Sequence, residues 1–548
     1  MPASTARRCL CGALASLLLA GPAAPGRAAE VLELRLDGLS IPIDLRQLQA
    51  WTTAPDQTSN DLTIWLNLLD PRSRRNLVQL LRAPLLRDRS FGQQLLGSWT
   101  GDHLLNEVGG LLVADSSDPQ QSSAALLRQT VNSLLAQRGE LSSLDLLLAL
   151  PSKRISLELD GVIALAEQWQ QQLQRQQQAW RQLSELALPT RRARPLQLSA
   201  QAGASAINTS LSVPHRREPL PLLLWPARGK PQGTWVVLMP GLGGGGDQLN
   251  WLAAALANWG WPVVVLDHPG SDAAAMKASL AGFRPPPGAE TLGARIADVN
   301  AVLAAQRAGE LAPLNLPAGA PVVLMGHSLG GLTALMAAGL TPEPGLAQRC
   351  HQALKRLPLT NLSRLLQCQL GERGLVQTKT AQTTATAPEV AAVVAFNGFG
   401  SLLWPRGGIG ALEQPVLLVG GSLDLITPPL SEQLVLFGGQ RNRTSRLALI
   451  EGASHFSPVR VEGEGSDLFQ LNGDLVGVDP RKVQALLLQL TAEFLLSLQR
   501  PLLLSPQLRE VDGVRAHVLN PWQARRWQRM LKTPAADPAA PPAHRRSP

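Results

Sequence analysis

The chain has 548 residues, several times the roughly 150 residues of a typical domain, so we expect more than one folded unit. Hydrophobic residues make up 45% and charged residues 17%, which excludes global disorder and predicts a large core. Most of the +9 net charge lies in the first 29 residues and in residues 509–548. The nearly neutral body and the absence of Cys/His clusters at zinc-ligand spacing predict no nucleic-acid partner, no metal and no cofactor.

The N-terminus predicts a secretory signal peptide over residues 1–29. Arg7 and Arg8 precede an apolar stretch over residues 9–20, and an Ala-Ala pair at residues 28–29 offers a cleavage site. The apolar stretch is too short to span a bilayer comfortably. We therefore expect an exported protein, periplasmic or secreted.

Residues 30–190 predict a mainly helical N-terminal domain. Two stretches alternate apolar and polar residues with period two, at 31–38 and 155–161, and read as short strands able to pair. The Gln-rich stretch 164–186 predicts one long solvent-facing helix. Residues 191–218, which carry an arginine cluster, are interpreted as a linker.

From residue 219 to residue 508 short apolar runs alternate with helical stretches. Continuous apolar runs flanked by Gly and Pro are typical of strands buried on both faces, so this region predicts a mainly parallel sheet with helices on both faces, an α/β architecture. The expected strands are 235–239, 263–266, 322–325, 390–396, 416–419 and 447–450, and the expected helices are 248–258, 291–307, 329–340 and 481–498.

A G-x-S-x-G element lies directly after the strand at 322–325 and before a helix. Its glycines allow the sharp turn that exposes a serine hydroxyl above the carboxyl edge of the sheet, which predicts Ser328 as a nucleophile. Asp424 and His455 follow the last two expected strands, in the chain order Ser–Asp–His that this fold uses. Glu413 and Glu451 are weaker substitutes for the acid.

Two backbone amides are expected to bind the oxyanion that forms during acyl transfer. One belongs to Leu329, the residue after the nucleophile, and the other to Leu242 in the glycine-rich loop after the first strand. That loop lacks the Lys-Ser/Thr of a phosphate-binding loop. Asp267 and His268 are interpreted as a structural turn.

Two segments are long enough to cap the site, residues 271–288 and residues 341–388. The second contains Cys350 and Cys368, and the sequence leaves open whether they form a disulfide.

Residues 509–548 are interpreted as a basic, partly disordered tail. Within it a short amphipathic helix near Trp527 has an apolar face opposite a basic one. The sequence favours packing of this helix on its own domain. The alternative is a peripheral contact with an anionic membrane surface.

The motifs PGLGGGG, LDHPGSD, GHSLGG, VLLVGGSLDLITPP and LIEGASHFS together resemble the cyanobacterial α/β-hydrolases often labelled predicted dienelactone hydrolases. Those proteins also carry a helical N-terminal domain, which resembles the stretch from DLRQLQAWTTA to RNLVQLL, and a more distant likeness is to platelet-activating-factor acetylhydrolases. The resemblance implies an α/β-hydrolase fold and a serine esterase or lipase-like enzyme with Ser328, Asp424 and His455 as its triad. Two features depart from the pattern, Pro240 before Gly241 where His is usual, and serine where true dienelactone hydrolases use cysteine.

These observations predict a serine hydrolase that cleaves carboxylic esters through an acyl-enzyme, with a small-molecule ester, acyl lipid or short-acyl phospholipid as substrate. One alternative is a non-catalytic binding or scaffolding protein that keeps the fold, and another is a peptidase or amidase that uses the same residues.

Overall fold

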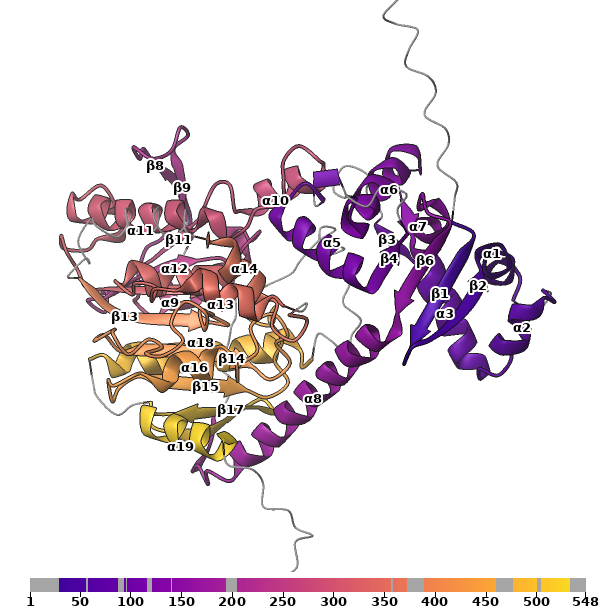
Figure 1. Ribbon diagram of the computed structural model, residues 1–548. Coiled ribbons are helices and arrows are strands. Elements are labelled where there is room, and N and C mark those ends of the chain that lie inside the picture. The colour runs from indigo at the N-terminus through magenta and orange to yellow at the C-terminus, as the bar shows by residue number, and fades with distance from the viewer. Residues whose placement is uncertain are drawn as a thin grey trace, which may run out of the picture. The chain divides into compact units, whose positions relative to one another are not determined.

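The computed structural model describes residues 29–55, 58–86, 93–94, 96–115, 121–138, 140–193, 205–355, 358–371, 389–459, 477–499 and 504–532. The chain divides into two compact units, Met1–Ala166 and Glu167–Pro548, which Figure 1 shows in indigo to purple and in magenta to yellow. The expected signal peptide, apart from Ala29, and the tail beyond residue 532 lie outside the described residues.

The first unit contains a small mixed sheet with helices around it, in agreement with the expected mainly helical domain. Its strand order is β2-β1-β6-β4, and β1 pairs in parallel with β6 from Val31↔Arg154 to Arg35↔Glu158. The two alternating stretches of the sequence therefore do pair. The strands are β1 (Val31–Leu36), β2 (Leu39–Asp44), β3 (Pro84–Leu86), β4 (Leu112–Ala114), β5 (Leu141–Ser142) and β6 (Arg154–Glu158), and the helices are α1 (Leu45–Thr53), α2 (Asp61–Leu66), α3 (Pro71–Arg82), α5 (Trp99–Leu111), α6 (Ser123–Arg138) and α7 (Ser143–Ala149).

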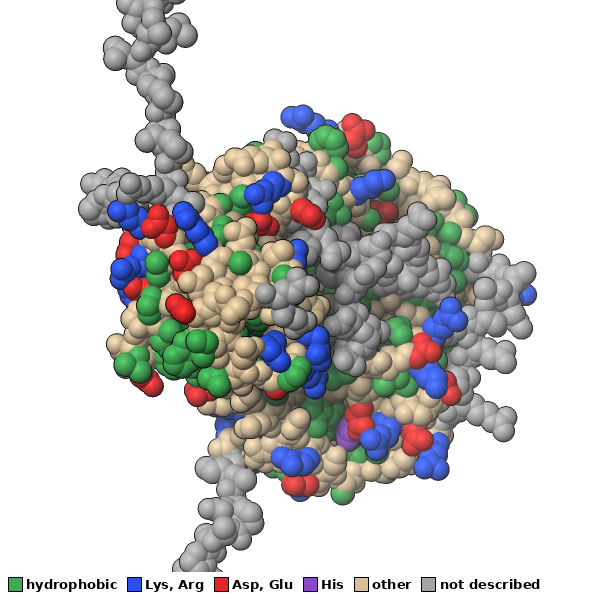
Figure 2. All heavy atoms as spheres, turned by 90° about the vertical axis from the view of Figure 1, so that its right-hand side faces the viewer, with side chains coloured by type: hydrophobic (Ala, Val, Ile, Leu, Met, Phe, Trp, Pro, Cys, Tyr) green, Lys and Arg blue, Asp and Glu red, His purple; other side chains and the backbone are tan. Residues whose placement is uncertain are grey.

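The core of this unit is built mainly from leucines of its helices, with Trp51 and Ile155 also buried. Large apolar side chains also remain on its surface, and Trp65 and Leu68 at the end of α2 are 71% and 77% exposed. Figure 2 views the molecule from the right-hand side of Figure 1 and shows hydrophobic side chains on the surface among arginine, lysine and acidic side chains.

The second unit is built on an eleven-stranded sheet in the order β7-β16-β17-β15-β14-β13-β12-β10-β11-β9-β8. Its six central strands are parallel, and every residue of β10 and β12 is buried. The strands are β7 (Thr190–Ala193), β8 (Ile207–Leu211), β9 (Leu220–Trp225), β10 (Trp235–Met239), β11 (Val263–Leu266), β12 (Val322–His327), β13 (Val390–Phe396), β14 (Val416–Gly421), β15 (Arg446–Ile450), β16 (Gln507–Val511) and β17 (Val514–Leu519).

Helices cover both faces of this sheet, which confirms the expected α/β architecture. Successive residues of β10 point to opposite sides, with Val237 in one hydrophobic cluster and Val236 in the other. The first cluster includes α11, α12, α16 and α19, and the second includes α9 and α18. The helices are α8 (Leu159–Ser184), α9 (Asn250–Asn258), α10 (Ala273–Leu280), α11 (Leu292–Arg307), α12 (Leu329–Ala337), α13 (Leu346–Ala353), α14 (Ser363–Gln369), α16 (Gln433–Gly438), α18 (Pro480–Ser497) and α19 (Pro521–Lys532).

The flanks of the sheet differ from the sequence-based domain boundaries. Strands β7 and β8 fall in or beside the stretch 191–218, for which the sequence predicts a linker, and they form the two edges of the sheet. Strands β16 and β17 extend the sheet beyond β15, although the sequence predicts a tail over residues 509–548. The structural unit therefore begins within α8 and includes the chain to at least residue 532.

The short amphipathic helix expected near Trp527 is α19, and it packs on its own unit. Trp527 is fully buried, and its indole Nε1 donates to the carbonyl oxygen of Ala179 in α8 at 3.1 Å. The apolar face of α19, which the membrane alternative required at the surface, thus lies in the core. No helix among the described residues has the length and apolar character needed to span a membrane.

Candidate active site

The G-x-S-x-G element forms a sharp turn between β12 and α12. Ser328 is the N-cap of α12 and has φ 53° and ψ −118°, a conformation that non-glycine residues rarely adopt. Its amide donates to the carbonyl oxygen of Phe396 at the end of β13, at 2.9 Å. Ser328 is 5% exposed, so its side chain is almost enclosed at the carboxyl end of the central strands.

The two glycines of the element are required by close backbone contacts. A Cβ atom at Gly326 would lie 2.3 Å from the carbonyl carbon of Gly330, and one at Gly330 would lie 2.3 Å from the carbonyl oxygen of Met239. Side chains at either position would force the strand and the helix apart. The same restriction extends to the glycine-rich loop, where a Cβ at Gly241 would lie 3.3 Å from the Cβ of Ser328. The loop therefore lies directly against the candidate nucleophile.

Asp424 and His455 meet as the sequence predicts. The imidazole Nδ1 of His455 lies 2.9 Å from Oδ2 of Asp424, and the side chains of both residues are buried. Asp424 follows β14 and His455 follows β15, so neighbouring parallel strands deliver the two side chains to one edge of the sheet. An imidazole bonded in this way carries its proton on Nδ1 and leaves Nε2 as an acceptor.

Asp424 also closes a local turn. Its Oδ1 accepts from the amides of Ile426 at 2.9 Å and Thr427 at 2.7 Å, and the Thr427 hydroxyl donates to Oδ2 at 2.6 Å. Burial raises the pKa of Asp424, but the charge and hydrogen bond of His455 and the hydrogen bonds from Thr427 outweigh it and hold the pKa below its usual value. The carboxylate is therefore ionised at neutral pH. The Asp424 side chain therefore both closes a local turn and accepts a hydrogen bond from His455.

The loop that carries His455 is tied to the serine element. Nε2 of His327 lies 2.8 Å from the carbonyl oxygen of His455, and the two imidazole rings are 4.9 Å apart. Nδ2 of Asn397, at the end of β13, donates to the same carbonyl oxygen at 3.0 Å. Asn397 has φ 50°, a left-handed conformation that asparagine tolerates better than most residues. These two contacts hold the imidazole of His455 beside the turn at Ser328.

Among the described residues, no hydrogen bond joins Ser328 Oγ to His455 Nε2. Catalytic hydrogen bonds are often long or poorly aligned before substrate binds. The amides of Leu329 and Leu242 likewise donate to no acceptor among the described residues. Leu329 is the first residue of α12, where backbone amides have no partner within the helix. Within the described part of the chain, both amides are therefore available to a ligand oxygen.

Three other polar residues that follow strands of the sheet, Glu451, His268 and Asp267, are bonded to other groups. Glu451 accepts from His517 at 2.8 Å and pairs with Arg515. His268 is fully buried and bonded through Nδ1 to Asp298 at 2.8 Å, which supports its interpretation as structural. Asp267 accepts from the Gly246 amide and thereby closes the glycine-rich loop.

Some residues of the site were not singled out from the sequence. His327 was visible only as the variable position of the serine element, and Asn397 and Thr427 lie in loops after β13 and β14. Polar residues directly after a buried strand of a parallel sheet are the available signal, because those strand ends meet at one edge. That signal does not say which of them contact His455.

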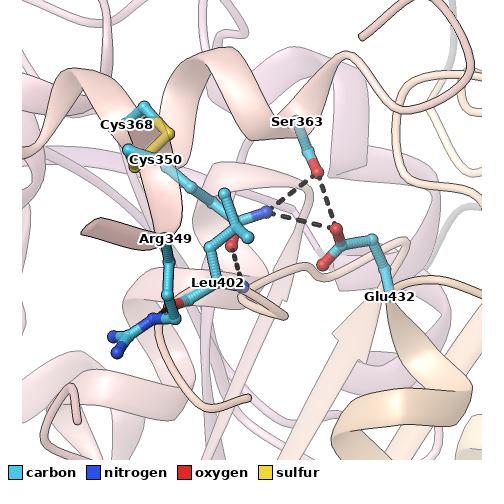
Figure 3. The surroundings of a disulfide bond; sticks show 7 residues. Arg349, Cys350, Ser363, Cys368, Leu402 and Glu432 are labelled. Atoms are coloured by element: carbon cyan, nitrogen blue, oxygen red, sulfur yellow. Dashed lines mark hydrogen bonds between the residues drawn. A yellow bond between two sulfur atoms is a disulfide. The ribbon is translucent and has the colours of Figure 1, made fainter. Parts of the chain in front are cut away.

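The segment expected to cap the site contains α13 and α14, joined by a disulfide between Cys350 and Cys368. Figure 3 shows the disulfide at one end of α14 and, at the other end, Ser363 directed toward the buried carboxylate of Glu432. Glu432 accepts from six donors, namely Asn361 Nδ2, Ser363 Oγ, Gln367 Nε2, Ser401 Oγ and the amides of Gly400 and Ser401.

This anchored segment touches the loop that carries Asp424. The amide of Ser363 donates to the carbonyl oxygen of Ile426 at 2.8 Å, two residues after Asp424. At the far end of α14, Gln369 Oε1 accepts from the amide of Ala289 at 3.1 Å. Helix α14, which belongs to the second expected cap segment, therefore contacts both the loop of Asp424 and the residue directly after the first expected cap segment.

Comparisons with known families agree with this architecture. Residues 236–464 match the model of the alpha/beta hydrolase family. Residues 28–158 match the model described as alpha/beta hydrolase of unknown function (DUF1400), and this range lies within the first unit. No curated protein matches the chain. The second unit thus has the α/β-hydrolase fold, and the family that residues 236–464 match is generally hydrolytic, which supports a hydrolase.

Proposed function

We propose that the second unit is a serine hydrolase that cleaves carboxylic esters, with Ser328, His455 and Asp424 as its triad. The observation that carries the proposal is the Nδ1–Oδ2 hydrogen bond of 2.9 Å between His455 and Asp424, on a loop tied to the serine element through His327. A nucleophile, a base and a group that orients the base are the minimum that acyl transfer to serine requires.

In the first half-reaction His455 Nε2 accepts the hydroxyl proton of Ser328 while Oγ attacks the ester carbonyl carbon. The carbonyl oxygen becomes an oxyanion, which the amides of Leu242 and Leu329 bind. The ionised Asp424 stabilises the imidazolium and fixes its tautomer. His455 then gives the proton to the leaving alkoxide, the ester C–O bond breaks, and an acyl-enzyme remains.

In the second half-reaction water replaces the alcohol. His455 takes a proton from water as the water oxygen attacks the acyl carbon, and the collapse of the second oxyanion returns the proton to Ser328 Oγ. The products are a carboxylic acid and an alcohol, and the enzyme is regenerated without a cofactor.

The proposed substrate is an acyl ester, including acyl lipids and short-acyl phospholipids. The segments with α10 and with α13–α14 flank the site and include apolar side chains, such as Leu359 and Leu362, that are partly exposed. Apolar covering of a site favours acyl chains over polar substrates. Turnover of p-nitrophenyl esters graded by chain length, together with a short-acyl phospholipid, would define the preference.

Export by the N-terminal signal peptide is part of the proposal. The disulfide between Cys350 and Cys368 supports it, because structural disulfides persist in oxidising compartments and are rare in the cytosol. N-terminal sequencing of the protein recovered from a periplasmic or culture fraction tests this part directly. A mature N-terminus near residue 30 is expected.

The test of the catalytic proposal is the Ser328→Ala variant assayed with p-nitrophenyl acetate. Loss of a nucleophile that acts as one unit with its base lowers turnover by about 10⁶-fold. An aminoacyl-anilide assayed in parallel separates an esterase from an amidase. A wild-type protein with no turnover of either substrate would favour a binding protein that keeps the fold.

A further inference from the structure

We propose that Arg295 is a positioning residue that holds both arms of the oxyanion hole through three hydrogen bonds. The inference rests on the proposed function and extends it to a residue outside the triad. Arg295 lies in α11, which covers one face of the sheet beside α12. The residue is 1% exposed, so its guanidinium is shielded from water. A charged side chain in such a position is costly unless its donors are satisfied.

The three guanidinium nitrogens of Arg295 donate to three different segments. Nη2 donates to the carbonyl oxygen of Pro240, Nη1 donates to Ser271 Oγ at 2.9 Å, and Nε donates to Thr333 Oγ1 at 3.2 Å. Pro240 begins the glycine-rich loop, Ser271 lies in the loop after β11, and Thr333 lies in α12. The guanidinium thus links the loop of one candidate oxyanion amide to the helix that carries the other.

The first arm is fixed on both sides of Leu242. Arg295 binds the carbonyl of Pro240, two residues before it, and the carbonyl oxygen of Ser271 accepts from the amide of Gly243, one residue after it, at 2.8 Å. Ser271 is therefore bonded to Arg295 through its hydroxyl and to the loop through its backbone. Holding the residues on either side of Leu242 sets the direction of its amide.

The second arm is fixed through Thr333. Its hydroxyl accepts from Arg295 Nε and donates to the carbonyl oxygen of Leu329, one helical turn earlier, at 2.7 Å. Thr333 is fully buried, so no water competes for these bonds. Leu329 supplies the second oxyanion amide. Its carbonyl group, in the next peptide, is held by the same chain of hydrogen bonds that begins at the glycine-rich loop, and this restrains the residue that carries the amide.

The acidic neighbour of Arg295 is bonded to other groups. Asp298, one turn later in α11, accepts from His215 at 2.7 Å, His268 at 2.8 Å and Arg216. Arg295 is therefore left to donate to neutral acceptors that belong to the site. A planar guanidinium presents donors in several fixed directions, whereas a lysine ammonium on a flexible stem cannot reproduce all three contacts. The residue type matches the positioning role.

The test compares Arg295→Met, Arg295→Lys and Thr333→Val with the wild-type protein, using an ester and its thiono analogue, in which sulfur replaces the carbonyl oxygen. Sulfur accepts hydrogen bonds weakly, so the ratio of kcat/KM for the two substrates reports on the oxyanion hole. We expect the ratio to fall by about 100-fold in Arg295→Met and by about 10-fold in Arg295→Lys and Thr333→Val, through kcat rather than KM.

The matched control is Arg307→Met, because Arg307 lies on the same helix but is partly exposed and paired with Glu389. It should keep the wild-type ratio. If Arg295→Met does not fold, Thr333→Val still tests the inference. It breaks the chain of hydrogen bonds from Arg295 to Leu329 without removing a charge. The inference would be overturned if the folded variants lost activity equally on the ester and on the thiono ester, or if they lost no activity on either. An inactive wild-type protein would instead overturn the proposed function.

Discussion

The Nε2 atom of His327 lies 2.8 Å from the carbonyl oxygen of His455. Because a carbonyl oxygen only accepts, Nε2 must carry a proton and the ring binds as a donor. Burial, together with the nearby charge of His455, lowers the pKa of His327 to about 3, so the ring is neutral at physiological pH. The residue before Ser328 thus fixes the loop that carries His455.

Replacing His327 should loosen that loop. We expect His327→Phe to lower kcat on a short-chain ester by about 10- to 100-fold, because displacement of a catalytic group by about 1 Å can cost about 100-fold in rate. His327→Gln is the matched control, since its side-chain amide can donate to the same carbonyl and should keep most of the activity. Equal activity of the Phe variant and the wild type would show that the contact does not position His455.

Substitutions at Asp424 can separate its contact with His455 from its contacts within the local turn. Asp424→Asn keeps an oxygen for the amides of Ile426 and Thr427, but it favours the wrong imidazole tautomer and should lower kcat by about 10⁴-fold. Asp424→Ala should also lower the melting temperature, because the part-buried amide of Ile426 and the buried amide of Thr427 lose their acceptor. Ester kinetics and thermal unfolding of both variants check this. A fully active Asn variant would exclude Asp424 as the orienting acid.

Because the pKa values of two buried histidines are lowered, we expect the protein to lose stability in mild acid. Burial, assisted by Arg295, lowers the pKa of His268 to about 4 from 6.5, and that of His327 lies at about 3. Between pH 6.5 and these values the unfolded chain binds protons that the native protein does not, so the free energy of unfolding falls as the pH falls. Each histidine contributes up to about 1.4 kcal/mol per pH unit.

Urea unfolding at pH 7, 6 and 5 measures this slope. His268→Gln should be less stable than the wild type at pH 7, since the Asp298 contact changes, and should show a shallower pH dependence. An unchanged slope in the variant would mean that His268 is protonated in the native protein.

The disulfide between Cys350 and Cys368 closes a loop with a sequence separation of 18. A loop of this size corresponds to about 3 kcal/mol of stabilisation, because the bond restricts the unfolded chain. The Cys350→Ser/Cys368→Ser double variant should be less stable by about that amount. Reductant should destabilise the wild type and leave the double variant unaffected, and a wild type insensitive to reductant would contradict the assignment.

The central parallel strands could be predicted from the sequence nearly residue by residue. Strands β10, β11 and β13 have the expected bounds, because both of their faces are buried and their sequences are continuous apolar runs between Gly and Pro. The edges of the sheet could not be predicted in this way. Strand β7 contains Thr190, Arg191 and Arg192, and such exposed polar residues read as a linker until a partner strand pairs with them.

The residues of the site also differ in how far the sequence predicts them. Ser328, Asp424 and His455 carry local signals, a glycine-flanked turn and polar residues directly after buried strands, and the structure brings the last two into contact. Arg295 carries no such signal, since a single arginine in an amphipathic helix usually faces solvent. Its role depends on three acceptors that only the folded chain brings together.

The most direct test of the central claim is covalent labelling of the purified native protein with a fluorophosphonate, followed by peptide mass spectrometry. A hydroxyl activated by His455 and Asp424 should form one adduct per chain, on Ser328, and heat-denatured protein or the His455→Ala variant should form none. Absence of the adduct from native protein, or an adduct on another serine, would contradict the account.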